Sequence, residues 1–205
     1  MVAFQMPVPM KITGRLSSIT NAFVNSSIPA VQPTDAEVEE ALTILGIARD
    51  DVRCAYCGDP SSEWDHLRPI VRDRRPTGYI TEIRNLVPAC GKCNQSKGNK
   101  DWRTWIFGSA RLSPASRGVA DLEDRVARLE AYENWGNPIK LDIPAIVGEE
   151  DWATHLGNLA EIETAMRSAQ KHSAELRARL SGSVGSARSE SEETYDGVLL
   201  GAPGW

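Results

Sequence analysis

The chain has 205 residues, of which 41% are hydrophobic and 25% charged, so it holds enough apolar side chains to bury a core in one or two compact units. No run approaches the roughly 18–20 consecutive apolar residues that cross a bilayer, and the start, MVAFQMPVPMKIT, lacks the basic end and apolar stretch of a signal peptide. We therefore expect a cytoplasmic protein without a membrane segment.

Residues 1–51 are predicted to be an N-terminal segment with one helix. Prolines interrupt the first thirty-odd residues, which predicts short extended pieces and loops there. The helix is expected from Thr34, where a capping-box pattern with Glu37 precedes apolar residues at helical spacing and Gly46 follows them.

All four cysteines fall in residues 52–108, as two C-x-x-C pairs. They are Cys54, Cys57, Cys90 and Cys93, and none is left over. Because disulfides are rare in the cytosol, the pairs predict a tetrahedral zinc site with four thiolate ligands. Four thiolates fill the coordination shell, so the zinc would be structural, with one ion per chain. A redox C-x-x-C or two accidental pairs is the alternative.

The rest of this segment is predicted to alternate strands and short helices. EIRNLVPAC has the alternation of a strand, and TGYITE can form another. NQSKG is predicted to be a short helix that ends at Gly98, and DWRTWIFG a second one bounded by Gly108.

Residues 109–180 are predicted to be a C-terminal helical region. Ser113-Pro114 is a helix start signal, and DLEDRVARLEAYENWGNP reads as a helix that stops at Gly136. From about residue 150 to 180 apolar residues recur close to a heptad, so this helix could pair with a second chain as a homodimer or pack on its own domain. Residues 181–205, rich in Ser, Gly and acids, are predicted to be a flexible tail.

Positive charge concentrates between residues 66 and 103, although the whole chain carries a net charge of −5. Between His66 and Arg103 there are nine bases and three acids. Local charge controls attraction to a polyanion over roughly 8–10 Å, so this segment can bind nucleic-acid phosphates. The candidate phosphate contacts are Arg68, Arg72, Arg74, Arg75, Arg84 and Lys100. An Arg-rich solvated loop is the alternative.

The stretch EWDHLRP carries the candidate catalytic histidine, His66. Asp65 and Asn94 offer oxygen ligands to a hard cation such as Mg²⁺, and Lys97 or Arg68 can add positive charge. A histidine with an ordinary pKa near 6.5 can accept a proton from water, and a cation can stabilise charge on a scissile phosphate. The alternative is that His66 has no catalytic role and only packs in the fold or contacts a phosphate.

Together, CAYCG, WDHLRP, NLVPACGKCN and NQSKG resemble the HNH or ββα-metal endonucleases, in the subgroup with two C-x-x-C knuckles. The resemblance covers about residues 52–100. It implies an α+β fold, in which a ββα-metal module clamped by a four-cysteine zinc site is flanked by an N-terminal helical segment and a C-terminal helical region.

The resemblance also implies roles for individual residues. His66 would be the general base, Asp65 and Asn94 the ligands of a catalytic magnesium or manganese ion, and Asn85 the residue that fixes the loop and orients the histidine. Asn94 stands where many members have a histidine, so the metal preference can differ.

The expected function is a metal-dependent DNA endonuclease from a restriction, defence or mobile-element context. The resemblance implies that it leaves 5′-phosphate and 3′-hydroxyl ends. One alternative is a zinc-stabilised nucleic-acid-binding module without cleavage activity. Another is a protein-interaction domain that uses the long helix. The sequence specifies neither the target sequence, nor a need for modified bases, nor the number of strands cut, nor DNA over RNA.

Overall fold

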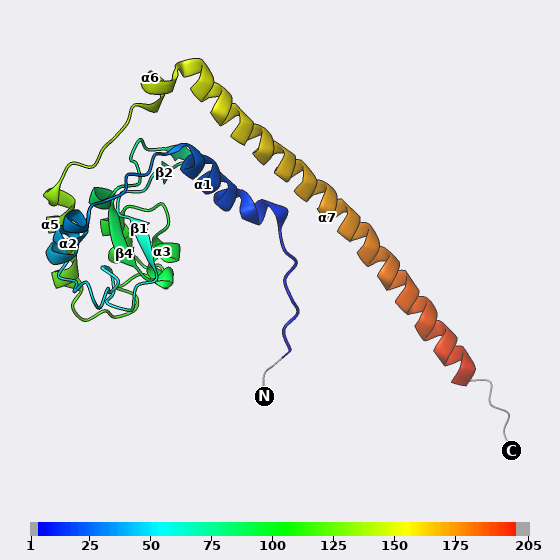
Figure 1. Cartoon of the computed structure of the whole chain (residues 1–205). Helices are drawn as coiled ribbons and strands as arrows, with labels where there is room; N and C mark the ends of the chain where they lie inside the picture. The colour runs from blue at the N-terminus through cyan, green and yellow to red at the C-terminus, as the bar shows by residue number, and fades with distance from the viewer. Residues whose placement is uncertain (1–3, 200–205) are drawn as a thin grey trace. The chain divides into compact units, whose positions relative to one another are not determined.

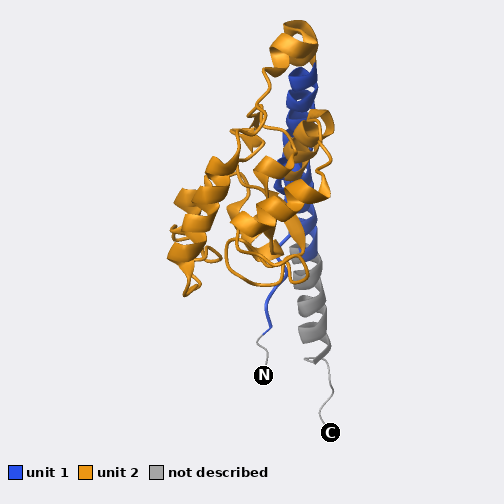
Figure 2. Cartoon of the chain, turned by 60° about the vertical axis from the view of Figure 1, so that its left-hand side comes forward, with its two compact units in different colours: residues 1–17, 155–205 blue, residues 18–154 orange. Residues whose placement is uncertain are grey.

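The computed structural model describes residues 4–199. The chain divides into two compact units, one formed by residues 18–154 and the other by residues 1–17 and 155–205 (Figure 2). Among the described residues, no helix is both long enough and apolar enough to cross a membrane.

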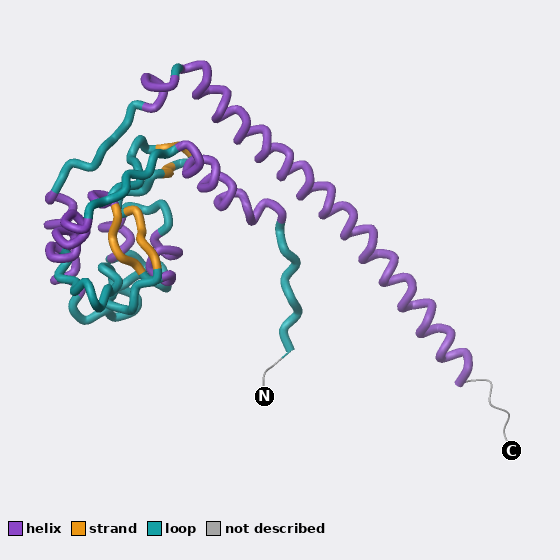
Figure 3. The backbone as a smooth tube through the Cα atoms, in the orientation of Figure 1, coloured by secondary structure: helices purple, strands orange, loops and turns teal. Residues whose placement is uncertain are grey.

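The larger unit is built mainly from short elements (Figures 1 and 3). Its helices and strands, together with the start of the last helix, are α1 (Leu16–Ser27), α2 (Asp35–Ile44), β1 (Glu63–His66), β2 (Val71–Arg72), β3 (Arg75–Pro76), the 3₁₀ turn η2 (Ile83–Asn85), β4 (Leu86–Ala89), α3 (Gly91–Lys97), α4 (Trp102–Ile106), α5 (Leu122–Trp135), α6 (Ile143–Val147) and α7 (Glu149–Leu199).

Strands β1 and β4 pair antiparallel, and helix α3 follows directly after β4. The register sets Glu63 opposite Ala89 and His66 opposite Leu86. Two ladder strands followed by a helix are the ββα arrangement that the sequence predicts, so the predicted α+β class is confirmed. The predicted strand EIRNLVPAC is shorter than expected, because its first residues form η2.

Strands β2 and β3 form a separate hairpin between β1 and β4, with Arg72 opposite Arg75. Its two turn residues, Asp73 and Arg74, both have positive φ, at 50° and 65°. Two successive residues with positive φ characterise the type I′ turn, whose twist matches that of paired strands. The hairpin therefore holds the arginines 72, 74 and 75, all exposed, around one tight turn.

The main core joins the cysteine segment to helices on either side of it. Tyr56 and Trp105 meet edge to face with ring centroids 5.2 Å apart, and both are buried. Helix α5 adds the buried Leu129 and Tyr132 to the same cluster. The Tyr132 hydroxyl donates to the Leu86 carbonyl oxygen at 2.7 Å and also contacts the Ile83 carbonyl, so α5 fixes the start of β4.

Several predicted elements agree with the structure. Helix α2 has the predicted capping box: the Thr34 side chain accepts from the Glu37 backbone N–H, and the Glu37 carboxylate accepts from the Thr34 N–H. Helix α3 ends before Gly98, helix α4 ends shortly before Gly108, and α5 ends before Gly136.

The prediction of loops throughout the first thirty residues is wrong, because residues 16–27 form α1. Its Ser-, Thr- and Asn-rich sequence has weak helix propensity. However, Thr20 and Val24 lie four residues apart on its buried side, and Val24 packs into a second core cluster with Ile28, Ile70 and Ile80. Tertiary packing of one face outweighs the weak propensity here.

Two further predictions are corrected. TGYITE forms no ladder strand; it makes isolated bridges, from Thr81 to Ala30 and from Tyr79 to Lys140. Ser113-Pro114 starts no α-helix: the Ser113 hydroxyl donates to the Gly108 carbonyl oxygen at 2.5 Å in a series of turns, and α5 begins only at Leu122.

The smaller unit contains the 3₁₀ turn η1 (Ile12–Arg15) and the greater part of α7. Within this unit, the backbone N–H of Thr13 donates to Gln170 Oε1 at 3.4 Å. Helix α7 continues past residue 180 to Leu199, through most of the segment predicted to be a flexible tail. The remaining tail residues, 200–205, lie outside the described part of the chain. The proposed division into four parts stays a prediction.

Candidate metal and nuclease site

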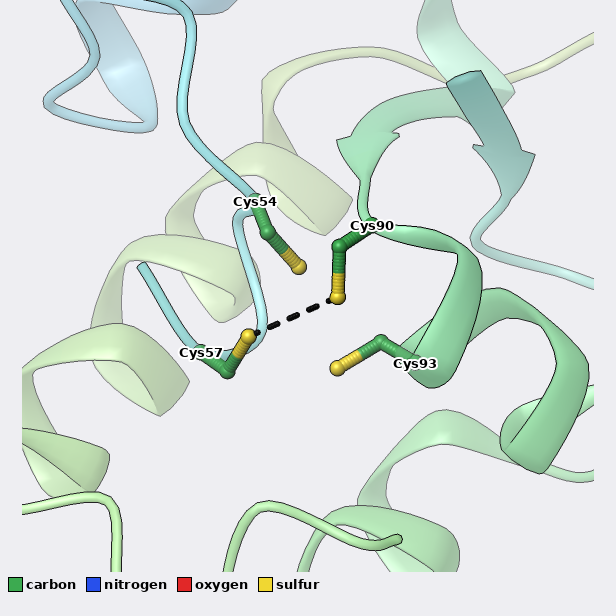
Figure 4. Close-up of side chains that lie close together, drawn as sticks. All are labelled: Cys54, Cys57, Cys90 and Cys93. Carbon is green, nitrogen blue, oxygen red and sulfur yellow. Dashed lines mark hydrogen bonds between the residues drawn. The ribbon is translucent and has the colours of Figure 1, made fainter. Parts of the chain in front are cut away.

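The four cysteines meet at one point, as Figure 4 shows. Their sulfur atoms all lie within 4.8 Å of one another, and Cys57 Sγ is 3.7 Å from Cys90 Sγ. A tetrahedral zinc ion with Zn–S bonds of about 2.3 Å requires sulfurs roughly 3.8 Å apart. The donor type, number and spacing therefore fit zinc.

Local backbone structure positions each pair. Cys54 and Cys57 lie on a tight turn closed by hydrogen bonds from the Gly58 N–H to the Cys54 carbonyl oxygen, at 2.9 Å, and from the Cys54 N–H to the Asp59 carbonyl oxygen, at 2.8 Å. Cys90 is the N-cap of α3, and Cys93 lies in the first turn of that helix. The strand-to-helix junction thus supplies the second pair.

Hydrogen bonds among the cysteines shift the pKa values of three of the thiols. The hydrogen bond with Cys57, together with burial, raises the pKa of Cys54 to about 12. Hydrogen bonds from Cys54 and Cys93 lower the pKa of Cys57, whereas those with Cys54 and Cys57 raise the pKa of Cys93. Cys54 and Cys93 therefore keep their protons at neutral pH, so binding a dication would release protons and stabilise the fold.

Two arginines from outside the cysteine segment surround this cluster. Arg117 Nη1 lies 3.5 Å from Cys93 Sγ, and its Nη2 donates to Asp59 Oδ2 at 2.7 Å. Arg125 of α5 donates to the Cys54 carbonyl oxygen at 3.2 Å. A zinc ion with four thiolates carries a net charge of −2, and these guanidinium groups oppose it. Neither arginine lies in the cysteine motifs, so the sequence analysis did not predict their contacts with the cluster.

A cleft of about 520 Å³ is lined by residues of α1, β1 and α3. Its lining includes Asp65 and His66 from the end of β1, Asn94 from α3, and Asn21 and Asn25 from α1. The structure therefore places the predicted base and both predicted metal ligands on one open cavity.

His66 is half-buried, and its ring Nε2 lies 2.9 Å from the Thr81 hydroxyl oxygen, Oγ1. Burial, and to a lesser extent the charge of Lys97, lowers the pKa of His66 to about 4. The imidazole is therefore neutral near pH 7 and carries one lone pair. If Nε2–H donates to Thr81, that lone pair is on Nδ1.

Asp65 is buried and fixed from two sides. Its Oδ2 accepts from the Tyr56 hydroxyl at 2.6 Å and pairs with Lys97 Nζ at 3.0 Å. Burial raises the pKa of Asp65 and lowers that of Lys97, and each charge opposes the shift of the other. Asp65 Oδ1 accepts no hydrogen bond from the part of the chain that the structure describes, which leaves it available to a cation.

Asn94 has its amide orientation set by Glu63. The Asn94 Nδ2 donates to Glu63 Oε2 at 2.8 Å, so the amide oxygen is the atom left for another partner. Carboxylate and amide oxygens are the ligands that Mg²⁺ and Mn²⁺ prefer. Asp65 and Asn94 therefore fit a hard divalent cation, with the remaining positions open to water and phosphate.

Comparison with known families decides what this arrangement is. A family model described as HNH endonuclease matches residues 54–100, which contain both cysteine pairs, Asp65, His66 and Asn94. Residues 54–100 are an HNH endonuclease domain. The resemblance inferred from the motifs is confirmed for that segment.

A curated relative supports the same assignment. The CRISPR-associated endonuclease Cas9 of Corynebacterium diphtheriae is 41% identical over 85 residues, which are 34% of this chain and 8% of the Cas9 chain. The chain therefore spans only a small part of this relative's length. No solved structure matches the chain significantly.

Asn85 of the HNH domain acts on the loop after His66. It is fully buried; its Oδ1 accepts from the Arg68 N–H at 2.9 Å, and its Nδ2 donates to the Arg68 carbonyl oxygen at 3.0 Å. The Leu67 N–H also donates to the Asn85 carbonyl oxygen at 2.8 Å. Asn85 thus holds the chain beyond the histidine, while Thr81 holds the ring itself.

Lys97 lies in a different place from the one its proposed role requires. Its side chain has no exposed surface, and besides Asp65 it donates to the His66 carbonyl oxygen at 2.7 Å. A fully buried ammonium does not reach a phosphate in the cleft. Lys97 instead joins α3 to the backbone that carries Asp65 and His66.

The predicted phosphate-binding residues fall into two groups. Arg72, Arg74 and Arg75 are exposed on the β2–β3 hairpin. The second group lies against other parts of the same unit: Arg84 lies over the Trp135 ring and 3.6 Å from Glu37, and Lys100 donates to the Ser96 carbonyl oxygen at 2.7 Å.

Arg68 also turns away from the cleft. Its Nη2 donates to the Glu133 carbonyl oxygen at 2.9 Å, and Arg68 lines a second cavity rather than the one that contains His66. The hairpin group, Arg72, Arg74 and Arg75, is the one of these that is exposed at the β2–β3 turn.

Three contributors to the site were missed from the sequence. Tyr56, Glu63 and Thr81 hold Asp65, Asn94 and His66 respectively. Tyr56 lies inside the first C-x-x-C, and Glu63 lies two residues before Asp65 on one strand, so alternation along β1 could have placed Glu63 on the same face. No local signal marks Thr81, which reaches the histidine only through tertiary structure.

Proposed function

We propose that this protein is a metal-dependent DNA endonuclease that hydrolyses phosphodiester bonds in the cleft of its HNH domain. The observation that carries the proposal is the convergence of Asp65, His66 and Asn94 on one open cavity. The same three residues supply a proton acceptor and two oxygen ligands, which hydrolysis of a phosphodiester requires.

His66 acts as the general base in this proposal. The depressed pKa keeps the imidazole unprotonated at neutral pH. With Nε2–H donating to Thr81, the lone pair on Nδ1 takes a proton from the attacking water. Lys97 binds the His66 carbonyl oxygen and Asn85 binds the Arg68 backbone two residues later, so that the ring keeps one position during the step.

Asp65 Oδ1 and the Asn94 amide oxygen hold the catalytic divalent ion, magnesium or manganese. When bound, such an ion neutralises charge on the scissile phosphate and on the leaving oxygen. The Tyr56 and Lys97 contacts at Asp65 Oδ2 fix the carboxylate, and Glu63 fixes the amide, before any substrate arrives. The products would carry 5′-phosphate and 3′-hydroxyl ends.

The substrate enters beside the exposed arginines of the β2–β3 hairpin, Arg72, Arg74 and Arg75. Contacts from such residues go to the phosphate backbone and carry no sequence information. We place the enzyme in the cytoplasm, in a restriction or defence role. A homodimer through the C-terminal helices would bring two copies of the site to one duplex, because α7 repeats apolar residues near a heptad.

A plasmid assay tests this function. Supercoiled DNA with Mg²⁺ or Mn²⁺ is expected to be nicked or linearised by the zinc-loaded protein and left intact by the His66→Ala variant. His172→Ala, which changes an exposed histidine of α7, is the matched control and should cut at the native rate. Native protein that binds DNA but never cuts it would favour the alternative, a zinc-stabilised binding module.

A further inference from the structure

Helix α1 lines the cleft that contains His66, although it lies outside the HNH domain along the chain. Three of its residues line that cavity, Ser18, Asn21 and Asn25, and all three belong to the same compact unit as the domain. Their spacing of three and four residues places them on one side of the helix, which we call the α1 polar face. The proposed hydrolysis uses none of these three side chains.

Packing holds α1 in place beside the cleft. Val24 and Ile28 are buried in the second core cluster with three residues that follow His66 along the chain, Ile70, Val71 and Ile80. On the polar face, Asn99 Nδ2 donates to Asn21 Oδ1 at 3.5 Å, which joins α1 to the turn after α3. Contacts on both its apolar and its polar side therefore fix the α1 polar face relative to the domain.

The lining of this cleft is polar but carries little charge. Among the described residues that line it, Asp65 and His66 are the titratable ones, and α3 and the turn after it add the amides Asn94, Gln95 and Asn99. Phosphate oxygens are charged and only accept hydrogen bonds, so Arg and Lys complement them best. Base edges present donors and acceptors together, as amides do. The amide lining therefore matches bases better than phosphates.

The hydrogen bonds of two α1 amides leave one donor and one acceptor. Asn25 Nδ2 donates to the Asn21 carbonyl oxygen at 2.8 Å, which leaves Asn25 Oδ1 as an acceptor. Asn21 Oδ1 accepts from Asn99, which leaves Asn21 Nδ2 as a donor. A base such as adenine presents one acceptor and one donor in the major groove, so this pair of atoms is complementary to a base edge.

We propose that the α1 polar face contacts base edges of the DNA bound in the catalytic cleft, and so gives the enzyme a base preference beside the cut. The hairpin arginines would bind the phosphate backbone without regard to sequence, whereas Ser18, Asn21 and Asn25 would read bases. The inference rests on the proposed function, because that function places DNA in this cleft.

Selection from a random pool tests this interface without requiring cleavage. The zinc-loaded full chain is mixed with random-sequence DNA duplexes in buffer without magnesium, and the bound DNA is sequenced. The native protein should enrich particular bases at one or more positions, by about 5-fold or more for each good contact. The double variant Asn21→Ala with Asn25→Ala should lose that enrichment.

Controls separate base reading from folding and from general affinity. Alanine is a better helix former than asparagine, so α1 should persist in the variant, and urea unfolding checks this. Asn134→Ala with Asn158→Ala, both exposed and on α5 and α7, should keep the native base preference. The salt dependence of binding should stay native in the α1 variant, because no charge is removed.

The outcomes for this interface and for the nuclease are distinct. An α1 double variant with the native base preference, or a native protein with no base preference, would overturn the inference. Plasmid that stays intact with a native protein that still selects bases would remove the proposed nuclease activity and leave this interface standing. Cleavage of plasmid by a native protein that selects no bases would do the reverse.

Discussion

At the scale of single residues, neighbouring side chains hold each of the three groups that we propose take part in hydrolysis. Asp65 Oδ2 accepts a hydrogen bond from Tyr56, which leaves Oδ1 for another partner. Asn94 Nδ2 donates to Glu63, which leaves the amide oxygen. His66 is fixed in the same way by Thr81. Positioning of this kind is worth a large part of the rate in many enzymes.

Substitutions at Thr81 test whether the orientation of the His66 ring matters for the rate. Thr81→Val should slow plasmid nicking by about 10- to 100-fold, because the imidazole loses the partner that sets its tautomer and direction. Thr81→Ser keeps a hydroxyl and should recover most of the rate. A Thr81→Val protein with native kinetics and an unchanged pH–rate profile would show that the ring needs no such partner.

Removing the Lys97 charge should destabilise the protein far more than a surface change. Lys97→Met leaves Asp65 buried without its cation, and breaking a buried pair in this way costs about 3–5 kcal/mol. Urea unfolding measures the loss. The double variant Lys97→Met with Asp65→Asn should recover part of it, and single and double variants of equal stability would show that the two charges are not coupled.

Sequence reasoning put Asp65, His66 and Asn94 in one site because motif spacing fixes them relative to the strands and α3, and all three line one cavity. Their catalytic roles, and that of Asn85, stay predictions. Sequence reasoning misplaced Lys97, since a spacing of three residues after Asn94 indicates a helical face but says nothing about burial. Thr81 was out of reach of such reasoning, because its contact with His66 comes from a bridge that joins residues 30 and 81.

At the scale of elements, the cysteine turns and α3 form one unit that a zinc ion would hold together. Cys90 caps α3 and the same helix supplies Asn94 and Lys97, so loss of the metal would release the catalytic ligand as well as the core. If the cysteines bind a structural zinc, as predicted, its removal should therefore affect activity as well as folding.

Cys90→Ser should lose zinc and cooperative unfolding together. Binding of a structural zinc contributes on the order of 10 kcal/mol in small zinc modules, and that free energy is also folding free energy. Elemental analysis should find about one zinc per native chain and little in the variant. A Cys90→Ser protein that unfolds cooperatively without metal would refute the clamp. Arg117→Lys, which keeps a cation beside Cys93, should retain the zinc.

The β2–β3 hairpin should carry the salt-dependent part of DNA binding. Replacing Arg74 and Arg75 by alanine removes two exposed charges, so the slope of log affinity against log salt should fall by about 2. Arg177 and Arg179, both exposed on α7, make the matched double control. An unchanged slope in the hairpin variant would move the phosphate contacts to another surface.

Among the elements, those with strong local signals were predictable. Helix α2 has a capping box, and α3, α4 and α5 each end within two residues of a glycine. Helix α1 was not predictable, because its residues have poor propensity and its stability comes from burying Val24 with side chains some 50 residues further along the chain.

At the scale of the whole molecule, the HNH domain does not form its core alone. Leu45 of the α2 cap and Leu129 and Tyr132 of α5 belong to the same buried cluster as the cysteines. A segment of about 50 residues buries little apolar surface by itself, so the flanking helices complete its core and a bound zinc would stabilise it further. Sequence patterns identified those helices but not their shared core.

The central claim is that His66 accepts the proton in hydrolysis, and chemical rescue tests it most directly. His66→Ala protein, folded and zinc-loaded, is assayed for plasmid nicking with Mg²⁺ and increasing imidazole. The account predicts a rate that is lost in the variant and partly restored by imidazole, in proportion to its unprotonated form. A variant that cuts DNA at the native rate without imidazole would contradict it.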